Sequence, residues 1–295
     1  MNKYVPPHLS QSEDIAIVGL ISDTHLPQRL AALPTRLTEI FESVDLILHA
    51  GDVGKLYVLD QLGEIAPVVA VHGNDDTEES QRELPFQQVV SIGGQRILLW
   101  HSHFPDRLDE MSFRNGNKWK DVWLRSASRA RRAGAGIAVF GHLHQPLVLT
   151  HEDILLINPG ALAPGGFFHR MRQHSVALLC LSREQPPHVI NVDIDAGKVF
   201  TPAQLEAEVS VFDTIQTGIV PITSDRLANA FWDMVHVVPE IDRPRLIEIY
   251  LELAHRCWSR ERERITCADL LQTVHNSNDL PLAISAAVEN FCGPE

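Results

Sequence analysis

A buried strand near the start of the chain constrains the fold more than any other feature. The residues from Ile15 to Ile21 are apolar and largely β-branched, and Ser22-Asp23-Thr24-His25 follows them at once. A short apolar run that ends in polar turn residues is typical of a strand covered on both faces, as in parallel sheets. Ligands of open α/β sheets collect at the carboxyl ends of such strands. Asp23 and His25 are two residues apart, so in an extended chain both side chains face one side and could form half of a metal site.

Strand and helix patterns alternate after this first strand. Buried-strand patterns at 45–50 and 68–71 are preceded by helical patterns at about 30–43 and 57–62. This order predicts parallel strands joined by right-handed crossovers.

A second group of strands follows, beginning with two strand patterns joined by the hairpin turn Gly93-Gly94. An Arg-rich stretch within 104–135 has helical spacing, and a strand pattern at 137–140 comes after it. The later strand patterns predict a second, mostly antiparallel sheet, so that the whole forms a two-sheet α/β sandwich. These later patterns lie at 146–150, 154–157, 175–182 and 188–194.

The pattern after Val199 is helical only. Thr201-Pro202 is a typical helix start, with Thr as the N-cap and Pro at the first helical position. We therefore predict a loose N-terminal leader at 1–13, an α/β domain at 14–199 and an all-helical extension, domain or cap, at 200–295. The further helices are expected at about 224–237, 242–264, 266–276 and 282–291.

Charge and composition exclude several classes of protein. The net charge is −13, with 18 Lys and Arg against 23 Asp and Glu in residues 1–200 and 7 against 15 in residues 201–295. Such a chain is not expected to bind nucleic acids in general or a membrane surface. The four cysteines have no Cys-x-x-Cys spacing, and no run approaches the roughly 20 apolar residues of a membrane span. We expect a cytoplasmic protein, whose acidic tail could be a lid or a surface for a protein partner or self-association.

Metal-binding residue types recur at the ends of the predicted strands. Carboxylate and amide oxygens together with imidazole nitrogens suit first-row divalent metals, and the lack of cysteine in the set argues against a thiolate zinc site. One aspartate, Asp52, stands between two halves that each carry histidines, which suggests two ions about 3.5–4 Å apart, the clamp for in-line displacement at phosphorus. The residues in chain order are Asp23, His25, Asp52, Asn74, His101, His103, His142 and His144.

The ordered motifs resemble those of the calcineurin-like metallophosphoesterases, most of all the YfcE-type phosphodiesterases and their Vps29 relatives. The resemblance covers about residues 14–195 and implies a four-layer α/β/β/α metallophosphoesterase sandwich of two mixed sheets. It rests on Asp23-x-His25, Gly51-Asp52, Gly73-Asn74-Asp75-Asp76, His101-x-His103, Gly141-His142-x-His144 and Asn158-Pro159-Gly160.

The resemblance also implies a reaction: hydrolysis of a small phosphoester, most of all a phosphodiester, by a hydroxide that bridges two divalent ions and attacks phosphorus. Manganese is the expected metal, with Fe, Zn, Ni or Mg as alternatives. Asn74 would help to neutralise the phosphoryl charge. The implied ligands of metal one are Asp23, His25, Asp52 and His144, and those of metal two are Asp52, Asn74, His101 and His142.

The chain departs from the family pattern at two places. Asp75 stands where many relatives have the histidine that protonates the leaving group, so that Asp75 or His103 would have to act there. Pro164-Gly165 replaces the family's Pro-Arg pair, for which Arg170 is a candidate substitute. The first departure fits phosphodiesters better than phosphoprotein. The alternatives are a phosphomonoesterase, including a protein phosphatase, or a Vps29-like non-catalytic interaction module.

Overall fold

The computed structural model describes residues 2–10, 14–277 and 279–293, and it divides into two compact units. The first unit contains the chain up to Ala163 together with Gln173–Gly218, and the second contains Pro164–Arg172 and the chain from Ile219 onward. Within the described residues, none of the helices combines the length and the apolar character that crossing a lipid bilayer requires.

The first sheet of the first unit has the strand order β13-β12-β11-β1-β2-β3. The three N-terminal strands are parallel to one another, as the sequence predicts. The prediction that the strands at 175–182 and 188–194 belong to the second sheet is wrong, because β11 pairs antiparallel with β1 and β12 follows it. All residues of β11 are buried, which suits an interior strand of the larger sheet. The bounds are β1 Ala16–Ile21, β2 Leu46–His49, β3 Val68–Ala70, β11 Ser175–Leu181, β12 His188–Asp193 and β13 Lys198–Phe200.

The second sheet has the order β4-β5-β6-β8-β7. A hairpin joins β4 to β5, and both turn residues, Gly93 and Gly94, have positive φ values of 58° and 76°, as a two-residue hairpin turn requires. Because β5, β6 and β8 are parallel, this sheet is mixed and not mostly antiparallel. The bounds are β4 Gln87–Ile92, β5 Gln95–Trp100, β6 Ile137–Phe140, β7 Leu147–His151 and β8 Ile154–Asn158.

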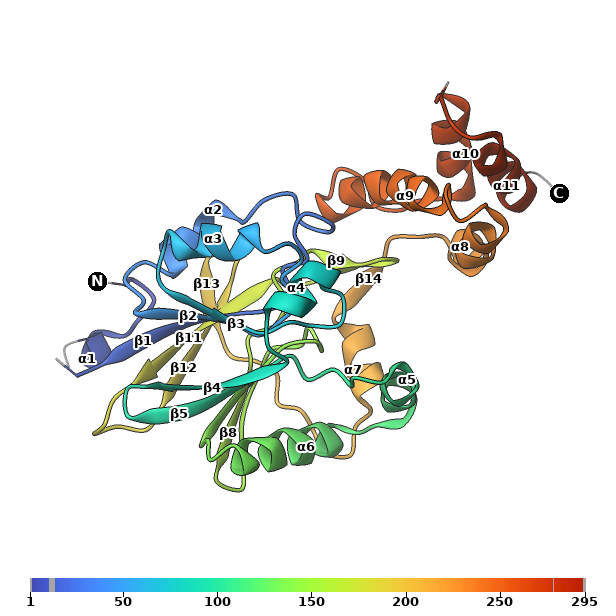
Figure 1. The fold of residues 1–295 in the computed structure, drawn as a ribbon. Coiled ribbons are helices and arrows are strands. Elements are labelled where there is room, and N and C mark those ends of the chain that lie inside the picture. Colours follow the sequence, from blue (N-terminus) through green and yellow to red (C-terminus); the bar gives the residue numbers. More distant parts are fainter. Residues whose placement is uncertain (1, 11–13, 278, 294–295) are drawn as a thin grey trace. The chain divides into compact units, whose positions relative to one another are not determined.

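Helices cover the outer faces of the two sheets, which gives the predicted four-layer sandwich (Figure 1). Helices α2 and α3 pack on the first sheet, and α6 packs on the second. Apolar side chains from both sheets, such as Leu20, Leu99 and Leu179, meet between them in a fully buried layer. The helices of this unit are α1 Pro7–Ser10, α2 Thr35–Ile40, α3 Tyr57–Gly63, α4 Glu78–Glu83, α5 Arg107–Gly116, α6 Trp119–Arg132 and α7 Val211–Thr217.

The N-terminal residues do not form the loose leader that the sequence predicts. Val5 and Leu9 are buried in the core under α2, and the Asn2 side chain donates hydrogen bonds to the carbonyl oxygens of Ile40 and Glu42 at 2.7 and 2.8 Å. Burial of two apolar side chains, Val5 and Leu9, is enough to hold this short polar segment against the core of the first unit. The rest of the predicted leader, residues 11–13, lies outside the described residues.

The segment after β13 also differs from the prediction. No helix begins at Thr201-Pro202, because residues 201–206 are irregular and α7 starts only at Val211. The segment instead follows the start of α6: the Trp119 and Lys120 amides donate to the carbonyls of Val209 and Ala207 at 3.1 and 3.0 Å. It therefore belongs to the first unit, and the second unit begins at Ile219 and not at the predicted residue 200.

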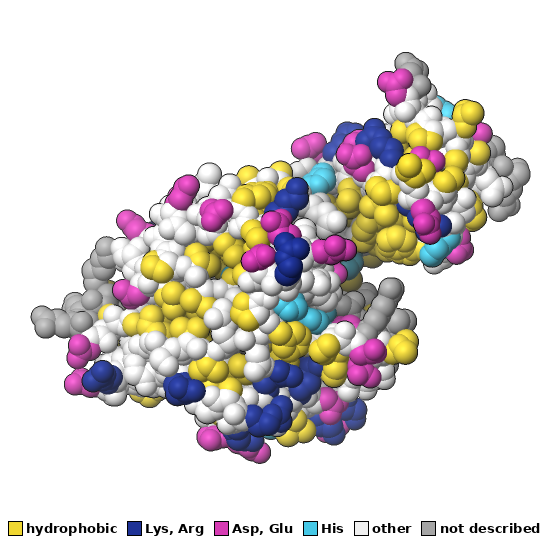
Figure 2. Space-filling model, viewed as in Figure 1, with side chains coloured by type: hydrophobic (Ala, Val, Ile, Leu, Met, Phe, Trp, Pro, Cys, Tyr) yellow, Lys and Arg dark blue, Asp and Glu magenta, His cyan; other side chains and the backbone are white. Residues whose placement is uncertain are grey.

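The second unit is a group of helices with one small sheet. The helices agree with the predicted ones, except that the second ends at Trp258 and not at 264. The helical-only prediction missed Ile219–Pro221, whose β-branched residues pair with His169–Met171. Figure 2 shows hydrophobic side chains grouped on the visible face of this unit. The elements are β9 Gly165–Gly166, β10 His169–Met171, β14 Ile219–Pro221, α8 Asp225–Val237, α9 Arg243–Trp258, α10 Cys267–His275 and α11 Leu282–Cys292.

Candidate metal centre

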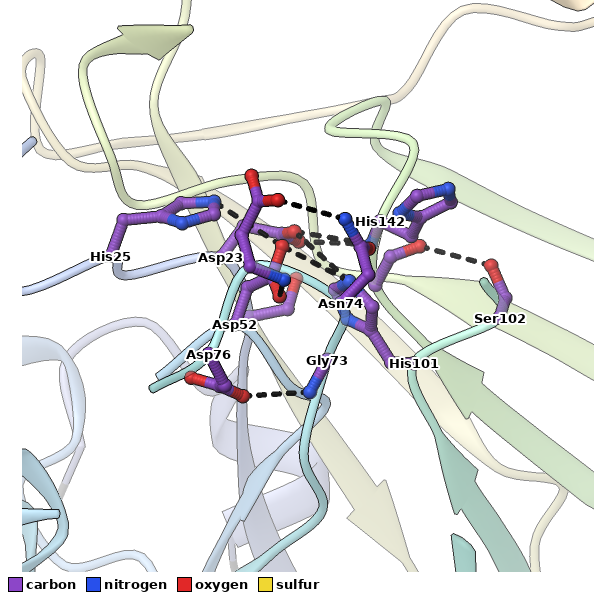
Figure 3. Close-up of polar contacts among 12 residues, drawn as sticks. Asp23, His25, Asp52, Gly73, Asn74, Asp76, His101, Ser102 and His142 are labelled. Atoms are coloured by element: carbon purple, nitrogen blue, oxygen red, sulfur yellow. Dashed lines mark hydrogen bonds and ion pairs between the residues drawn. The ribbon is translucent and has the colours of Figure 1, made fainter. Parts of the chain in front are cut away.

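The backbone turns sharply where the candidate ligands follow their strands. Asp23 and His25 after β1 and Asp52 after β2 have φ values of 54°, 47° and 54°, and His142 and His144 after β6 have 72° and 54°. This left-handed region costs a residue other than glycine about 1–3 kcal/mol, and residues held in it cluster at functional sites. The strained turns aim side chains from both sheets at one place (Figure 3).

Two carboxylates form the middle of the site. Asp52 Oδ2 lies 3.5 Å from His25 Nε2 and 3.2 Å from His101 Nε2, so this aspartate stands between the two rings. Asp23 Oδ1 lies 3.2 Å from His144 Nε2. Figure 3 shows His25 on one side of the aspartates and Asn74 with His101 on the other. Asp52 therefore lies between the ring that follows β1 and the ring that follows β5.

Most of the predicted ligands meet in small clusters of close ligand atoms. In each cluster the atoms lie within 4.8 Å of one another, which is a spacing that one ion can span. Asp75, predicted as a catalytic residue, belongs to the third cluster. The clusters are Asp23 with His25 and His144, Asp23 with Asp52 and His101, and His25 with Asp52 and Asp75.

Among the described residues, buried atoms of His25, Asn74, His101 and His103 have no hydrogen-bond partner, and two of them belong to the predicted second metal site. The ring of His101 is fixed by Nδ1, which lies 2.7 Å from the Ala50 carbonyl, and its Nε2 has no hydrogen bond. The Asn74 amide donates through Nδ2 to Asp75 Oδ1 at 3.0 Å, and its Oδ1 is left without a partner. Buried polar atoms are almost always paired. A nitrogen and an oxygen left open in this way fit a divalent metal.

The charges at the site are strongly coupled. Burial opposes ionisation of Asp23, but neighbouring His144 and His101 lower its pKa to about 2. Burial likewise opposes ionisation of Asp52, yet His101 and His25 hold its pKa well below the usual value. Burial favours neutral His101, but the Asp52 carboxylate raises its pKa to about 10. A proton on His101 thus compensates two buried carboxylates, which is the work that a bound cation would do.

His142 is held in a different way from the other predicted ligands. Its backbone amide donates to the Asp23 carboxylate, with distances of 3.1 and 3.2 Å to the two oxygens. Its ring Nε2 lies 2.5 Å from Glu110 Oε1 on α5, and the ring centroid is 5.1 Å from that of His101. Metal-binding histidines commonly use their second nitrogen to contact a carboxylate in this way. The sequence reasoning missed Glu110, because nothing in its spacing relates it to the histidine doublets.

Two of the motif glycines are required by close approach. A Cβ atom at Gly73 would lie 2.0 Å from Asp52 Oδ1, and one at Gly141 would lie 2.9 Å from Asp23 Oδ2. Any side chain at either place would push a carboxylate out of the site. The Gly73 amide also donates to Asp76 Oδ2 at 2.7 Å, and Asp76 Oδ1 accepts from the Gly54 amide at 2.6 Å, which ties the loops after β2 and β3 together.

The predicted catalytic residue His103 lies against the wall of the site. Its ring centroid is 5.4 Å from that of His101 and 5.1 Å from that of Phe86. Burial and the neighbouring His101 and His142 lower the pKa of His103 to about 3. The ring is therefore neutral near pH 7 and carries no acidic proton to give.

A second residue that the sequence reasoning missed is Arg29. Its Nη2 donates to Asp75 Oδ2 at 2.6 Å, and its Nη1 lies 3.1 Å from His25 Nε2. Burial and Arg29 together lower the pKa of His25 to about 3. One signal was present in the sequence: Arg29 is the only Lys or Arg between Asp14 and Arg36, directly after the first motif.

Comparisons with known proteins agree with this geometry. The calcineurin-like phosphoesterase superfamily domain matches residues 17–184. A probable metallophosphoesterase of Methanothermobacter thermautotrophicus is 34% identical over 145 residues, which are 49% of this chain and 76% of that protein. A phosphodiesterase of Methanocaldococcus jannaschii is 26% identical over 159 residues, 48% of this chain and 82% of that one. The structure of Vacuolar Protein Sorting 29 from Cryptosporidium parvum is 22% identical with a TM-score of 0.49, covering 66% of this chain and 99% of that one. The chain therefore belongs to the calcineurin-like phosphoesterase superfamily.

Proposed function

We propose that this protein is a metal-dependent phosphodiesterase with a dinuclear centre. The observation that carries the proposal is the buried pair Asp23 and Asp52, surrounded by imidazoles, with Asn74 Oδ1 lacking a hydrogen-bond partner among the described residues and His101 Nε2 facing Asp52 at 3.2 Å. Isolated buried charges are costly, so a pair of carboxylates is stable here only with cations beside it. The resident proton on His101 supplies one positive charge, and divalent ions would supply more.

The proposed ligands divide into two sets that share Asp52. Mn²⁺ suits this mixture of carboxylate, amide and imidazole ligands. When bound, two such ions would make water ionise near neutral pH and would neutralise charge on a phosphoryl group. The first set is Asp23, His25, Asp52 and His144, and the second is Asp52, Asn74, His101 and His142.

The surroundings of the site favour particular leaving groups. Both oxygens of Asp75 accept hydrogen bonds, from Asn74 and from Arg29, so its carboxylate is occupied as an acceptor. His103 is neutral because burial lowers its pKa to about 3. A leaving oxygen would thus depart without a proton from either residue, which disfavours simple alkoxides and supports esters with more acidic leaving groups. The preference for a phosphodiester over a phosphomonoester is supported separately, by the relative that is named a phosphodiesterase.

The test compares bis-p-nitrophenyl phosphate with p-nitrophenyl phosphate in the presence of Mn²⁺, with metal content measured on the same protein. We expect faster turnover of the diester. Faster turnover of the monoester would favour a phosphomonoesterase, and turnover of neither by metal-loaded protein would favour a non-catalytic interaction module.

The Asp52→Asn variant ties this activity to the site. Loss of an outer-shell partner alone costs metal sites about 10–100-fold in affinity or activity, so loss of the bridging carboxylate should reduce turnover at least about a hundredfold. The matched control is Asp153→Asn, which removes an exposed carboxylate paired with Arg131. Undiminished turnover by Asp52→Asn would mean that the site is elsewhere.

A further inference from the structure

The geometry points to Arg29 as a residue that binds the phosphoryl group of the substrate, with Asp75 as the residue that positions it. This inference deepens the proposed function and rests on it. The family's Pro-Arg pair is replaced here by Pro164-Gly165, and the candidate substitute Arg170 lies on β10, in the second unit. Arg29, by contrast, is beside His25 and Asp75 in the first unit.

The guanidinium of Arg29 lies at the rim of the metal centre. It contacts the buried His25 on its inner side and Asp75 on its outer side. The Arg29 side chain is 17% exposed and the Asp75 side chain is 43% exposed. These contacts use two of the five N–H groups, and the described residues offer this guanidinium no other hydrogen bond. The contact with His25 Nε2 would be released if that nitrogen bound a metal, so the contact with Asp75 is the one that fixes the guanidinium. The remaining donors are suited to the paired oxygens of a phosphoryl group, which guanidinium binds in a fork geometry.

The loop that carries Arg29 is fixed before any ligand arrives. The Leu26 amide donates to the Val53 carbonyl at 3.2 Å, the Lys55 amide donates to the Leu26 carbonyl at 2.9 Å, and the Arg29 amide donates to the His25 carbonyl at 2.9 Å. The loop after β1 is thus paired with the loop after β2. A cation held in place in advance loses little freedom when it binds an anion.

Asp75 connects this arginine to the metal ligands. Its amide donates to Asp52 Oδ1 at 2.9 Å, its Oδ1 accepts from Asn74 and its Oδ2 accepts from Arg29. A partly exposed ion pair by itself adds little to the stability of the fold. The geometric effect is larger, because a single carboxylate sets both the direction of the Asn74 amide and the position of the guanidinium. Asp75 therefore acts as a positioning residue at the place where many relatives have a proton donor.

The test measures binding of inorganic phosphate to Mn²⁺-loaded protein by calorimetry, so it does not depend on turnover. Arg29→Gln should weaken phosphate binding by about tenfold or more, since hydrogen bonds to charged groups contribute about 1.5–3 kcal/mol. Arg29→Lys should fall between Arg29→Gln and the unaltered protein, because an ammonium cannot make the paired contact. Arg132→Gln, which removes an exposed charge on α6 that donates to the Ser128 hydroxyl, is the matched control and should change nothing.

Asp75→Asn separates positioning from simple electrostatics. Removing a negative charge beside an anion site should strengthen phosphate binding if Asp75 only repels the ligand. We expect weaker binding, because Arg29 loses its anchor. Stronger or unchanged binding in Asp75→Asn would overturn the positioning role, and unchanged binding in both Arg29 variants would overturn the role of Arg29.

The outcome is distinguishable from failure of the proposed function. If the unaltered protein hydrolyses neither ester but binds phosphate through Arg29, the proposed function fails and this inference stands. Mn²⁺ affinity and the circular dichroism spectrum of each variant identify any misfolding; should Arg29→Gln misfold, the charge-conserving Arg29→Lys decides the question.

Discussion

Both units of this chain bury aromatic rings, such as Trp100 in the first and Phe231 in the second, but among the described residues the buried charged side chains lie in the first unit. The first unit buries ionised groups at its strand ends, where Asp23, Asp52 and His101 are at most 2% exposed. The second unit buries rings, and its buried Tyr250 hydroxyl is hydrogen-bonded to the Thr223 side chain and the Phe167 carbonyl. Buried charge opposes folding unless it is compensated, whereas buried rings favour it. The comparison indicates that the candidate metal centre lies in the first unit, and it leads us to expect that the interior of the second unit acts on stability.

The largest effect expected from this comparison is on stability. Phe231 is fully buried among Phe167, Phe168, Trp232 and Tyr250, with ring centroids 4.6–5.9 Å away. Phe231→Ala should lower the free energy of unfolding by about 3–5 kcal/mol through the lost contacts and the cavity. Denaturant unfolding measures this loss, and turnover per folded molecule should not change.

The control for this variant is Phe212→Ala, which truncates an exposed phenylalanine and should change stability by less than about 0.5 kcal/mol. If Phe231→Ala reduced turnover in protein that is still folded and metal-loaded, the division of roles between the units would be wrong.

A smaller effect is expected where a helix supports the metal centre. Glu110→Gln removes the charge beside His142 Nε2 while keeping the shape of the side chain. We expect Mn²⁺ affinity to fall by about 10–100-fold, because such carboxylates orient the ring and raise its basicity. Competition with a chelator of known affinity measures the change.

Glu208→Gln is the matched control, since Glu208 is exposed and its ion pairs with described residues are to Lys118 and Lys120. Equal Mn²⁺ affinity for the two variants would show that the contact with Glu110 has no part in holding His142 as a ligand.

The smallest expected effect is the change in metal affinity per pH unit, which depends on the proton that His101 carries. Because the pKa of His101 in the metal-free protein is raised from 6.5 to about 10, its ring carries a proton at pH 7–9 that a metal must displace. Binding should release about one proton, and affinity should rise about tenfold per pH unit over this range. Calorimetry in two buffers of different ionisation enthalpy counts the protons.

The same shift affects the metal-free fold. A raised pKa stabilises the folded state fully below pH 6.5, and this contribution is lost as pH rises towards about 10. The free energy of unfolding of metal-free protein should therefore fall across that interval. Metal-loaded protein should not show this fall, because the metal has displaced the proton on His101. Proton release near zero would mean that metal binds without His101.

The strands and their polar ends could be predicted from the sequence because both signals are local. A buried strand is a continuous apolar run, and Asp23 or His142 follows its strand within two residues. The partition of strands into sheets could not be read in this way: β11 is as apolar as any strand, and only its pairing with β1 assigns it to the first sheet. Residues 201–210 have helix-start signals, but backbone contacts with α6 hold them in an irregular path.

The sequence was enough to select the candidate ligands. It was not enough to find the side chains that contact and orient them. The histidine doublets repeat one spacing and Asn74 follows the end of a predicted strand, so these residues are visible without a structure. Glu110 reaches His142 from a helix 32 residues away, and Arg29 reaches Asp75 across 46 residues. Such contacts depend on where loops and helices pack, which no local pattern specifies. The sequence therefore does not predict the side chains, such as Glu110 and Arg29, that orient the candidate site residues.

The origin of the ligands on two sheets has a mechanical consequence. Asp23 and Asp52 come from the first sheet, and His101 and His144 come from the second. At the other end of the strands the hairpin turn at Gly93 of the second sheet packs against Leu181 of the first sheet, so the two sheets meet there through van der Waals contact. Bound ions would add a reversible crosslink between the sheets, beside the hydrogen bonds that join them at the ligand end. At a metal concentration a hundred times the dissociation constant, such a crosslink would add about 2.7 kcal/mol to the free energy of unfolding. The supply of metal would then affect the stability of the protein as well as its chemistry.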